Sequence, residues 1–229
     1  MLKLPRERLE LFQLGWRASD EGEIGGRPVM YTTQPWQVFA WTATRYGELG
    51  VRIISANLTR EGASVEVAIT AKSWRQIWSK AEAIDLVTSH LRRGEWASLL
   101  TMWLDDGKAE RREVLSSEYR LVIATKEPWR LSNSIGTRKA LVATGREAFE
   151  RLREVAGVYG VLLDLLKAHK WIDVKLATDD ALRLAHNLGV FHYFEELCEV
   201  DYARGVCLRP YMKNLVSKDI TGFSLCSGR

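Results

Sequence analysis

The chain alternates between stretches whose apolar residues recur with the helical period and stretches in which apolar and polar residues alternate. Apolar spacings of three and four predict helices, and a spacing of two predicts half-buried strands. Helices are predicted over residues 1–14, 35–46, 73–92, 94–106 and 137–168, the last broken near Gly145 and bent near Gly157 or Gly160, and over 178–187. Strands are predicted over residues 28–33, 51–58, 64–70, 108–115, 118–125 and 171–176, with a glycine-rich loop over 15–26. This mixture predicts an α+β fold.

Two regions follow from this order of elements. Residues 1–93 form a smaller N-terminal α+β region, and residues 94–229 form a second domain whose last part, 190–229, has no clear pattern. Helix, hairpin and helix occur in that order in both regions. The end of the first such helix, residues 39–47, resembles residues 99–107, with Tyr46 in the place of Asp106. One hypothesis is therefore a degenerate tandem repeat that forms an internal pseudo-dimer.

Residues 99–107, Leu-Leu-Thr-Met-Trp-Leu-Asp-Asp-Gly, end an apolar helix in two carboxylates and a glycine. Gly107 can adopt a positive φ and end this helix. Asp105 and Asp106 lie at the helix C-terminus, where the helix dipole disfavours negative charge. A divalent metal ion would compensate that charge, because carboxylate oxygens are good ligands for hard cations. The alternative is a buried helix that ends in an ordinary Asp-Asp-Gly turn.

This stretch resembles the LAGLIDADG motif of homing endonucleases, especially the intein-type variant LLGLWIGDG. The positions that match this variant identically are Leu99, Leu100, Trp103, Asp106 and Gly107. Two positions depart from it: Thr101 stands where glycine is usual, and Asp105 stands where glycine or alanine is usual. The chain also resembles the repeat-family proteins of crenarchaea called PaRep, which implies a source and no chemistry.

The resemblance implies a LAGLIDADG-like unit over residues 94–188, with helix, hairpin, helix, strand and helix in order and paired strands that bind double-stranded DNA. It implies phosphodiester hydrolysis with a divalent metal such as Mg²⁺, held by one acid from each of two facing motif helices. Asp106 is the catalytic and metal-binding acid on this basis, and Asp105 is a further metal candidate without a counterpart in the family. A single motif requires a homodimer or the internal pseudo-dimer, and Thr101 is expected to push two such helices apart.

Lysine and arginine outnumber glutamate from residue 108 to residue 146, in and beside the second predicted hairpin. A basic surface of this kind contacts phosphates, and arginines can reach base edges. The alternative is a solvated charged hairpin. The candidate DNA-binding residues are Lys108, Arg111, Arg112, Arg120, Lys126, Arg130, Arg138 and Lys139.

Composition limits the remaining choices. The 229 residues have a formal net charge of +4, which permits binding to nucleic acid. No apolar run is long enough for a membrane helix and no signal-peptide core is present, so we expect a cytoplasmic protein. Scarce Asn and Gln favour a thermophilic source. The leading hypothesis is a LAGLIDADG-like endonuclease; the alternatives are a non-catalytic DNA-binding or regulatory descendant and a protein-interaction module of unrelated α+β fold.

Overall fold

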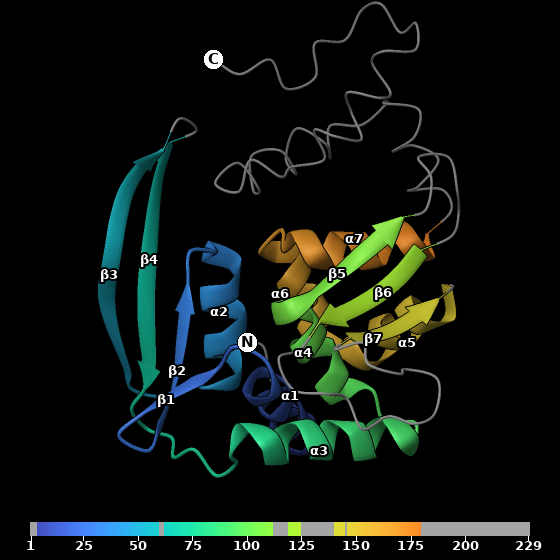
Figure 1. The fold of residues 1–229 in the computed structure, drawn as a ribbon, viewed down its shortest axis with the longest axis horizontal. Coiled ribbons are helices and arrows are strands. Elements are labelled where there is room, and N and C mark those ends of the chain that lie inside the picture. Colours follow the sequence, from blue (N-terminus) through green and yellow to red (C-terminus); the bar gives the residue numbers. More distant parts are fainter. Residues whose placement is uncertain (1–3, 60–61, 112–118, 125–139, 145, 180–229) are drawn as a thin grey trace, which may run out of the picture.

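The computed structural model describes residues 4–59, 62–111, 119–124, 140–144 and 146–179 (Figure 1). The elements up to residue 92 are α1 (Arg6–Ala18), β1 (Gly22–Ile24), β2 (Arg27–Thr32), α2 (Pro35–Thr44), β3 (Leu49–Thr59), β4 (Gly62–Ala71) and α3 (Lys80–Arg92). They are followed by α4 (Ala97–Asp106), β5 (Gly107–Arg111), β6 (Tyr119–Ala124), β7 (Ala140–Thr144), α5 (Arg146–Ala156), α6 (Val158–Leu165) and α7 (His169–Thr178). The predicted α+β class is therefore confirmed.

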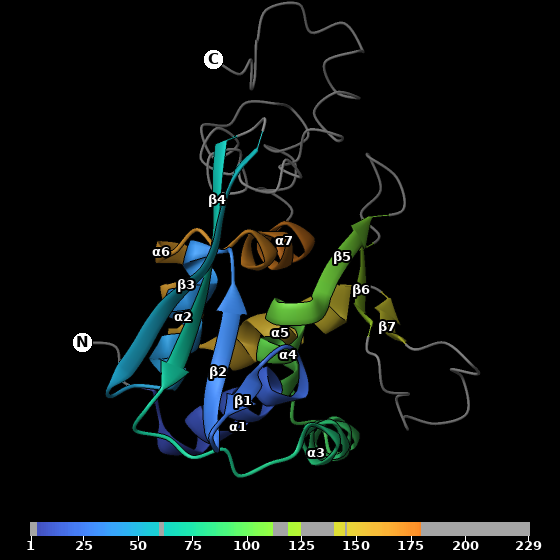
Figure 2. The same cartoon turned by 60° about the vertical axis from the view of Figure 1, so that its left-hand side comes forward.

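Two antiparallel sheets lie on opposite sides of a group of helices that includes α1 and α4 (Figures 1 and 2). The first sheet has the strand order β1-β2-β4-β3, and Met30 pairs with Ile69 and Val51 pairs with Ile69 within it. The second sheet has the order β5-β6-β7, and Val122 pairs with both Lys108 and Val142. The hairpins are continuous in sequence, so their pairing is local and antiparallel.

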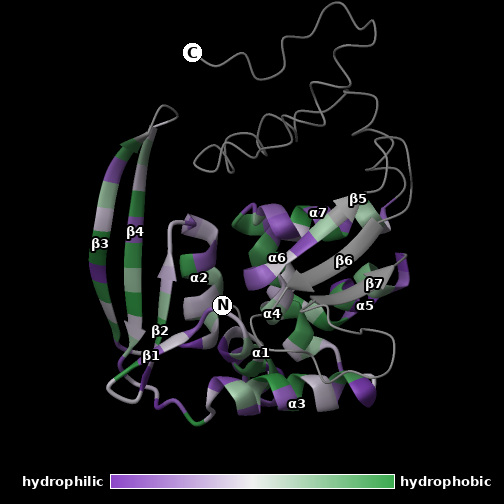
Figure 3. Ribbon diagram, in the orientation of Figure 1, coloured by the Kyte–Doolittle hydropathy of each residue, from purple (hydrophilic) through white to green (hydrophobic). Residues whose placement is uncertain are grey.

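One hydrophobic core contains residues from both predicted regions, 1–93 and 94–229. Its largest fully buried side chains include Trp16, Trp41 and Trp103. The rings of Phe12 and Tyr159 stack with their centroids 4.8 Å apart, which ties α1 to α6. Hydrophobic residues also continue along β3 and β4 beyond the core (Figure 3), where Leu58 is 92% exposed.

Several predicted elements are confirmed with small shifts in their bounds. The helix predicted over residues 35–46 is α2, with Pro35 as its first residue, and the hairpin predicted over 51–70 is β3 and β4. The antiparallel hairpin predicted after Asp106 is β5 and β6. The bend predicted near 157 is the break between α5 and α6, where Gly157 has a φ of 49°. In the described part of the chain, the hairpin of β5 and β6 begins directly after α4, the helix that contains residues 99–106.

The N-terminal loop prediction is wrong. Helix α1 continues through Gly15 to Ala18, and Gly22–Ile24 forms strand β1. The helix predicted from residue 73 begins only at Lys80, because Ser79 forms a reciprocal capping box with Glu82. Residues 73–79 instead make tertiary contacts; for example, the Trp74 indole N–H donates to the Tyr46 carbonyl at 2.6 Å.

Two predictions in the second half are also wrong. Residues 140–144 were included in a predicted helix but form β7, because all five residues pair with β6. The strand predicted over residues 171–176 is part of helix α7 instead, and this helix packs against α5. After the β5–β6 hairpin, the described chain therefore continues with one strand, β7, and three helices, α5, α6 and α7. The helix predicted over 178–187 and the unassigned segment 190–229 lie outside the described residues, apart from 178 and 179.

Candidate functional site at two helix ends

Helices α1 and α4 approach each other closely at Gly15. A Cβ atom on Gly15 would lie 2.0 Å from the Ser98 carbonyl oxygen and 2.1 Å from the Thr101 hydroxyl oxygen, so only glycine fits. The Thr101 hydroxyl donates to the Phe12 carbonyl oxygen at 2.8 Å. Thr101 therefore does not hold α4 away from α1; the expectation that it separates two facing copies of the motif helix stays a prediction. The missing side chain of Gly15 leaves space for Thr101, and the Thr101 hydroxyl donates its hydrogen bond to a buried carbonyl oxygen.

This packing brings the C-terminal ends of α1 and α4 together. Asp20 is an exposed residue just beyond α1, and Asp106 is the last residue of α4. The Asp20 main-chain N–H donates to the carboxylate of Asp105, the neighbour of Asp106, at 2.7 Å, which places Asp20 beside the end of α4. Burial and the negative charge of Asp20 raise the pKa of Asp106 to about 6, although Lys170 and Lys80 act in the opposite direction. A pair of crowded acids from two helices thus lies at one end of the helix pair.

Asp105 points toward α1 and α2. Its Oδ2 accepts hydrogen bonds from the Ser19 hydroxyl and the Asp20 main-chain N–H, both at 2.7 Å. Its Oδ1 accepts a hydrogen bond from the Gln37 side-chain amide. Burial, with the nearby Asp20 charge, raises the pKa of Asp105 to about 7 despite these donors. The three donors occupy both carboxylate oxygens, which makes Asp105 a less accessible cation ligand than Asp106.

A lysine completes the group. The Lys170 ammonium donates to the main-chain carbonyl oxygen of Asp105 and also lowers the pKa of Asp106 through its charge. Lys170 belongs to α7 and is largely buried. Its positive charge therefore lies beside the last turn of α4, where the helix dipole favours a cation.

The turn after α1 is fixed by a buried network around Glu21. The Arg45 guanidinium donates to Glu21 Oε1 at 2.7 Å and to Oε2 at 3.0 Å. The Trp41 indole N–H and the Gln76 amide also donate to this carboxylate, each at 2.7 Å. Because Glu21 directly follows Asp20, this network fixes the main chain on the C-terminal side of Asp20.

The residues that match the motif have packing roles in the structure. Leu99, Leu100 and Trp103 are buried in α4. Gly107 begins β5 with a φ of −79°, so the prediction of a positive φ at this glycine is wrong. A Cβ atom on Gly107 would lie 2.1 Å from the Trp103 indole ring. Glycine is therefore required there by contact with the tryptophan.

The predicted DNA-binding residues are only partly described. Lys108 is exposed at the start of β5, Arg111 ends this strand and Arg120 lies in β6. Those outside the described residues are Arg112, Lys126, Arg130, Arg138 and Lys139.

The predicted repeat, which relates residues 39–47 to residues 99–107, does not match the packing of the helices, because α4 packs mainly against α1 and α2 does not face it. Tyr46 follows α2, and its ring meets Trp74 edge-on, with the centroids 5.2 Å apart. The helix that faces α4 is α1. The sequence signal for it was present but missed: Gly15 lies five residues before Asp20, just as Thr101 lies five residues before Asp106.

Within the described ranges, no three or more His, Cys, Asp or Glu side chains are grouped so that they could hold a metal ion. The candidate metal site is thus a pair, Asp20 and Asp106. In the same part of the chain no helix is long and apolar enough to cross a membrane. No protein-family model, curated protein or solved structure matches this chain.

The raised pKa values predict how stability depends on pH. The two carboxyl groups of Asp105 and Asp106 bind protons more tightly in the folded chain than in the unfolded chain, where their pKa values are near 4. Their stabilising contribution is therefore complete below about pH 4 and is lost as the pH rises through about 6 and 7. We expect the melting temperature of metal-free protein to fall between about pH 5 and 8.

Thermal unfolding followed by circular dichroism in chelator-treated buffers would measure this fall. The groups that face the two acids are Asp20, Lys80 and Lys170. Asp106→Asn should reduce the pH dependence, because it removes one of the two titrations. A melting temperature that rises steadily over the same range in wild type, and equally in Asp106→Asn, would contradict the assignment.

Proposed function

We propose that this protein binds double-stranded DNA and hydrolyses a phosphodiester bond with a divalent metal ion, in the manner of the LAGLIDADG endonucleases it resembles. Asp20 and Asp106 are the two metal-binding acids in this proposal. The observation on which it rests is the meeting of these acids at the adjoining ends of α1 and α4. The resemblance implies one acid from each of two facing helices, and this chain supplies both.

The contacts between α1 and α4 support an internal pseudo-dimer. If Asp20 corresponds to Asp106, then Gly15 corresponds to Thr101 and Phe12 to Ser98. The contacts are reciprocal in this correspondence: Gly15 lies against the Ser98 carbonyl, and Thr101 bonds the Phe12 carbonyl. Such reciprocity is what a two-fold relation between two helices produces. The proposal therefore needs no second copy of the chain.

The residues present fit a hard cation. Burial and the nearby charge of Asp20 disfavour the charged form of Asp106, and a bound cation would relieve that repulsion. Magnesium is commonly held by one or two carboxylates, with water and substrate phosphate completing its shell. When bound, the metal neutralises the phosphate and activates the attacking water. Lys170 keeps a positive charge beside Asp106 and holds the main chain of Asp105.

The two sheets give the proposed DNA surface. The elements of residues 6–92 run helix, hairpin, helix, hairpin and helix, and a second hairpin directly follows α4. The sheets flank the helix pair on both sides (Figure 2). Strands on either side of two central acids could contact the duplex on both sides of a scissile phosphate. The net charge of +4 favours such contacts.

We expect duplex DNA to bind without strict sequence dependence at low salt and to weaken steeply as salt rises, because phosphate contacts release counterions. Fluorescence anisotropy of a labelled duplex across a salt series would measure the slope. The absence of binding at ~50 mM salt, where surface charges are least screened, would contradict the proposal.

Nicking of supercoiled plasmid with Mg²⁺ or Mn²⁺ tests the second half of the proposal. Protein that binds DNA but never nicks it with either metal would be a non-catalytic DNA-binding protein.

A further inference from the structure

Asp105 stands where the motif has a small residue, so the family assigns it no role. In this chain its carboxylate lies between the ends of α1 and α4. Two bonds from the residues that directly follow α1 converge on its Oδ2, from the Ser19 hydroxyl and the Asp20 N–H, at 2.7 Å each. A carboxylate only accepts hydrogen bonds, and the groups that bond to it here are donors. The Asp105 carboxylate is therefore chemically complementary to the donors around it.

We propose that Asp105 is a positioning residue that fixes the separation of the two metal-binding carboxylates by tying the end of α1 to the end of α4. This inference rests on the proposed function, because it takes Asp20 and Asp106 as the metal ligands. Asp105 itself is not a ligand in this proposal. Its role is to hold the main chain of one ligand while it is covalently joined to the other.

The position of Asp20 shows why such a tie is needed. Asp20 lies beyond the last residue of α1 and is exposed, so the helix alone does not fix it. Its main-chain N–H is held by Asp105, and its neighbour Glu21 is held by Arg45. Asp106, by contrast, is the last residue of α4 and next to Asp105 in the chain. Loss of the Asp105 bond would free Asp20 to move relative to Asp106.

Asp105 is itself held by two further groups, one on its side chain and one on its main chain. The Gln37 amide donates to its Oδ1, and Gln37 in turn accepts a hydrogen bond from the Thr32 hydroxyl. The Lys170 ammonium donates to its main-chain carbonyl. Groups that orient metal ligands from outside the coordination shell typically change metal affinity by about 10–100-fold when they are lost. An anchored carboxylate between two ligands is in the right place for such an effect.

The test is the affinity of full-length, metal-free protein for Mn²⁺ without DNA, measured by calorimetry beside the melting temperature. Asp105→Asn keeps the shape but turns an amide NH₂ or a weaker acceptor toward the Asp20 N–H. We expect the dissociation constant for Mn²⁺ to rise by about 10–100-fold. The control is Gln13→Leu, which removes a buried hydrogen bond from α1 to the Thr44 carbonyl, away from the acids. It should lower the melting temperature and leave Mn²⁺ affinity within about threefold of wild type, well short of the loss expected from Asp105→Asn.

Wild-type Mn²⁺ affinity in Asp105→Asn would overturn the inference and leave the proposed function standing. Equal losses of affinity in Asp105→Asn and Gln13→Leu would also overturn it, because the effect would then follow stability alone. If Asp105→Asn does not fold, Ser19→Ala decides: it removes one of the two Oδ2 donors and should weaken Mn²⁺ binding, and unchanged affinity would overturn the inference. Absence of Mn²⁺ binding by wild type would instead remove the proposed metal site, and this inference with it.

Discussion

Asp106→Asn should abolish metal-dependent nicking of plasmid DNA while leaving DNA binding nearly intact. The amide keeps the shape of the side chain but removes the negative charge that would hold a cation at the helix end. Loss of an outer-shell group typically costs up to about 100-fold, so we expect loss of a proposed ligand to cost more than that. Asp20→Asn should have the same effect, because the structure places this acid opposite Asp106.

Plasmid nicking with Mg²⁺ and anisotropy with labelled duplex, measured on the same preparations, would separate the two effects. Asp85→Asn is a matched control, because Asp85 is an exposed carboxylate on α3. Asp105→Asn should reduce nicking less than Asp106→Asn does. Nicking that survives Asp106→Asn but is lost in Asp105→Asn would contradict the assignment of the acids.

Arg45→Met should lower the free energy of unfolding by about 3–5 kcal/mol, because it leaves the buried Glu21 carboxylate without its cation. The side chains of Arg45 and Glu21 are 2% and 0% exposed, so water cannot replace the lost partner. Equilibrium unfolding in urea would measure the change.

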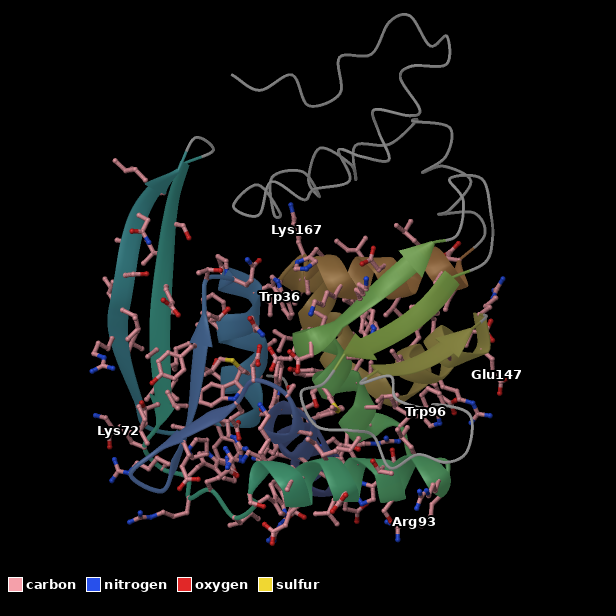
Figure 4. All side chains as sticks on the ribbon, viewed as in Figure 1. Trp36, Lys72, Arg93, Trp96, Glu147 and Lys167 are labelled. Atoms are coloured by element: carbon pink, nitrogen blue, oxygen red, sulfur yellow. The ribbon has the colours of Figure 1, made fainter. Side chains whose placement is uncertain are left out.

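The control is Lys72→Met, which breaks an ion pair with Glu48 at the periphery of the molecule (Figure 4). That pair is exposed on both sides, so its loss should cost at most about 1 kcal/mol. The double variant Glu21→Met/Arg45→Met should be more stable than Arg45→Met, since it removes the unpaired charge. Equal costs for Arg45→Met and Lys72→Met would show that the buried pair contributes no more than the surface pair.

The sequence predicted secondary structure best where a short-range pattern of apolar residues determines the element. The stripe of Leu99, Leu100 and Trp103 located α4, and the alternating residues after it located β5 and β6. These elements depend on neighbours in the chain, so periodicity reports them directly. The acid at Asp106 was found for the same reason, since it ends the helix whose pattern was clearest.

The second acid was missed because Gly15 reads as the end of a helix. In the structure glycine continues α1, since the Ser98 carbonyl and Thr101 hydroxyl leave no room for a Cβ atom. That requirement comes from a helix far away in the sequence and leaves no local periodic signal. The strand β7 and the helix α7 were mispredicted for a similar reason, because pairing with β6 and packing against α5 outweigh local propensity.

The close approach of α1 and α4 also has a consequence for synthesis on the ribosome. The hydrogen bond between Thr101 and Phe12 joins residues 89 positions apart. At about 5–20 residues per second, roughly 5 to 20 seconds separate the synthesis of these two residues. During that interval the face of α1 at Gly15 lacks α4, although α2 and α3, which also contact α1, have already been synthesised. Nascent chains stalled before residue 97 should therefore expose this face of α1 to chaperones or to other copies, and chains that include α4 should not.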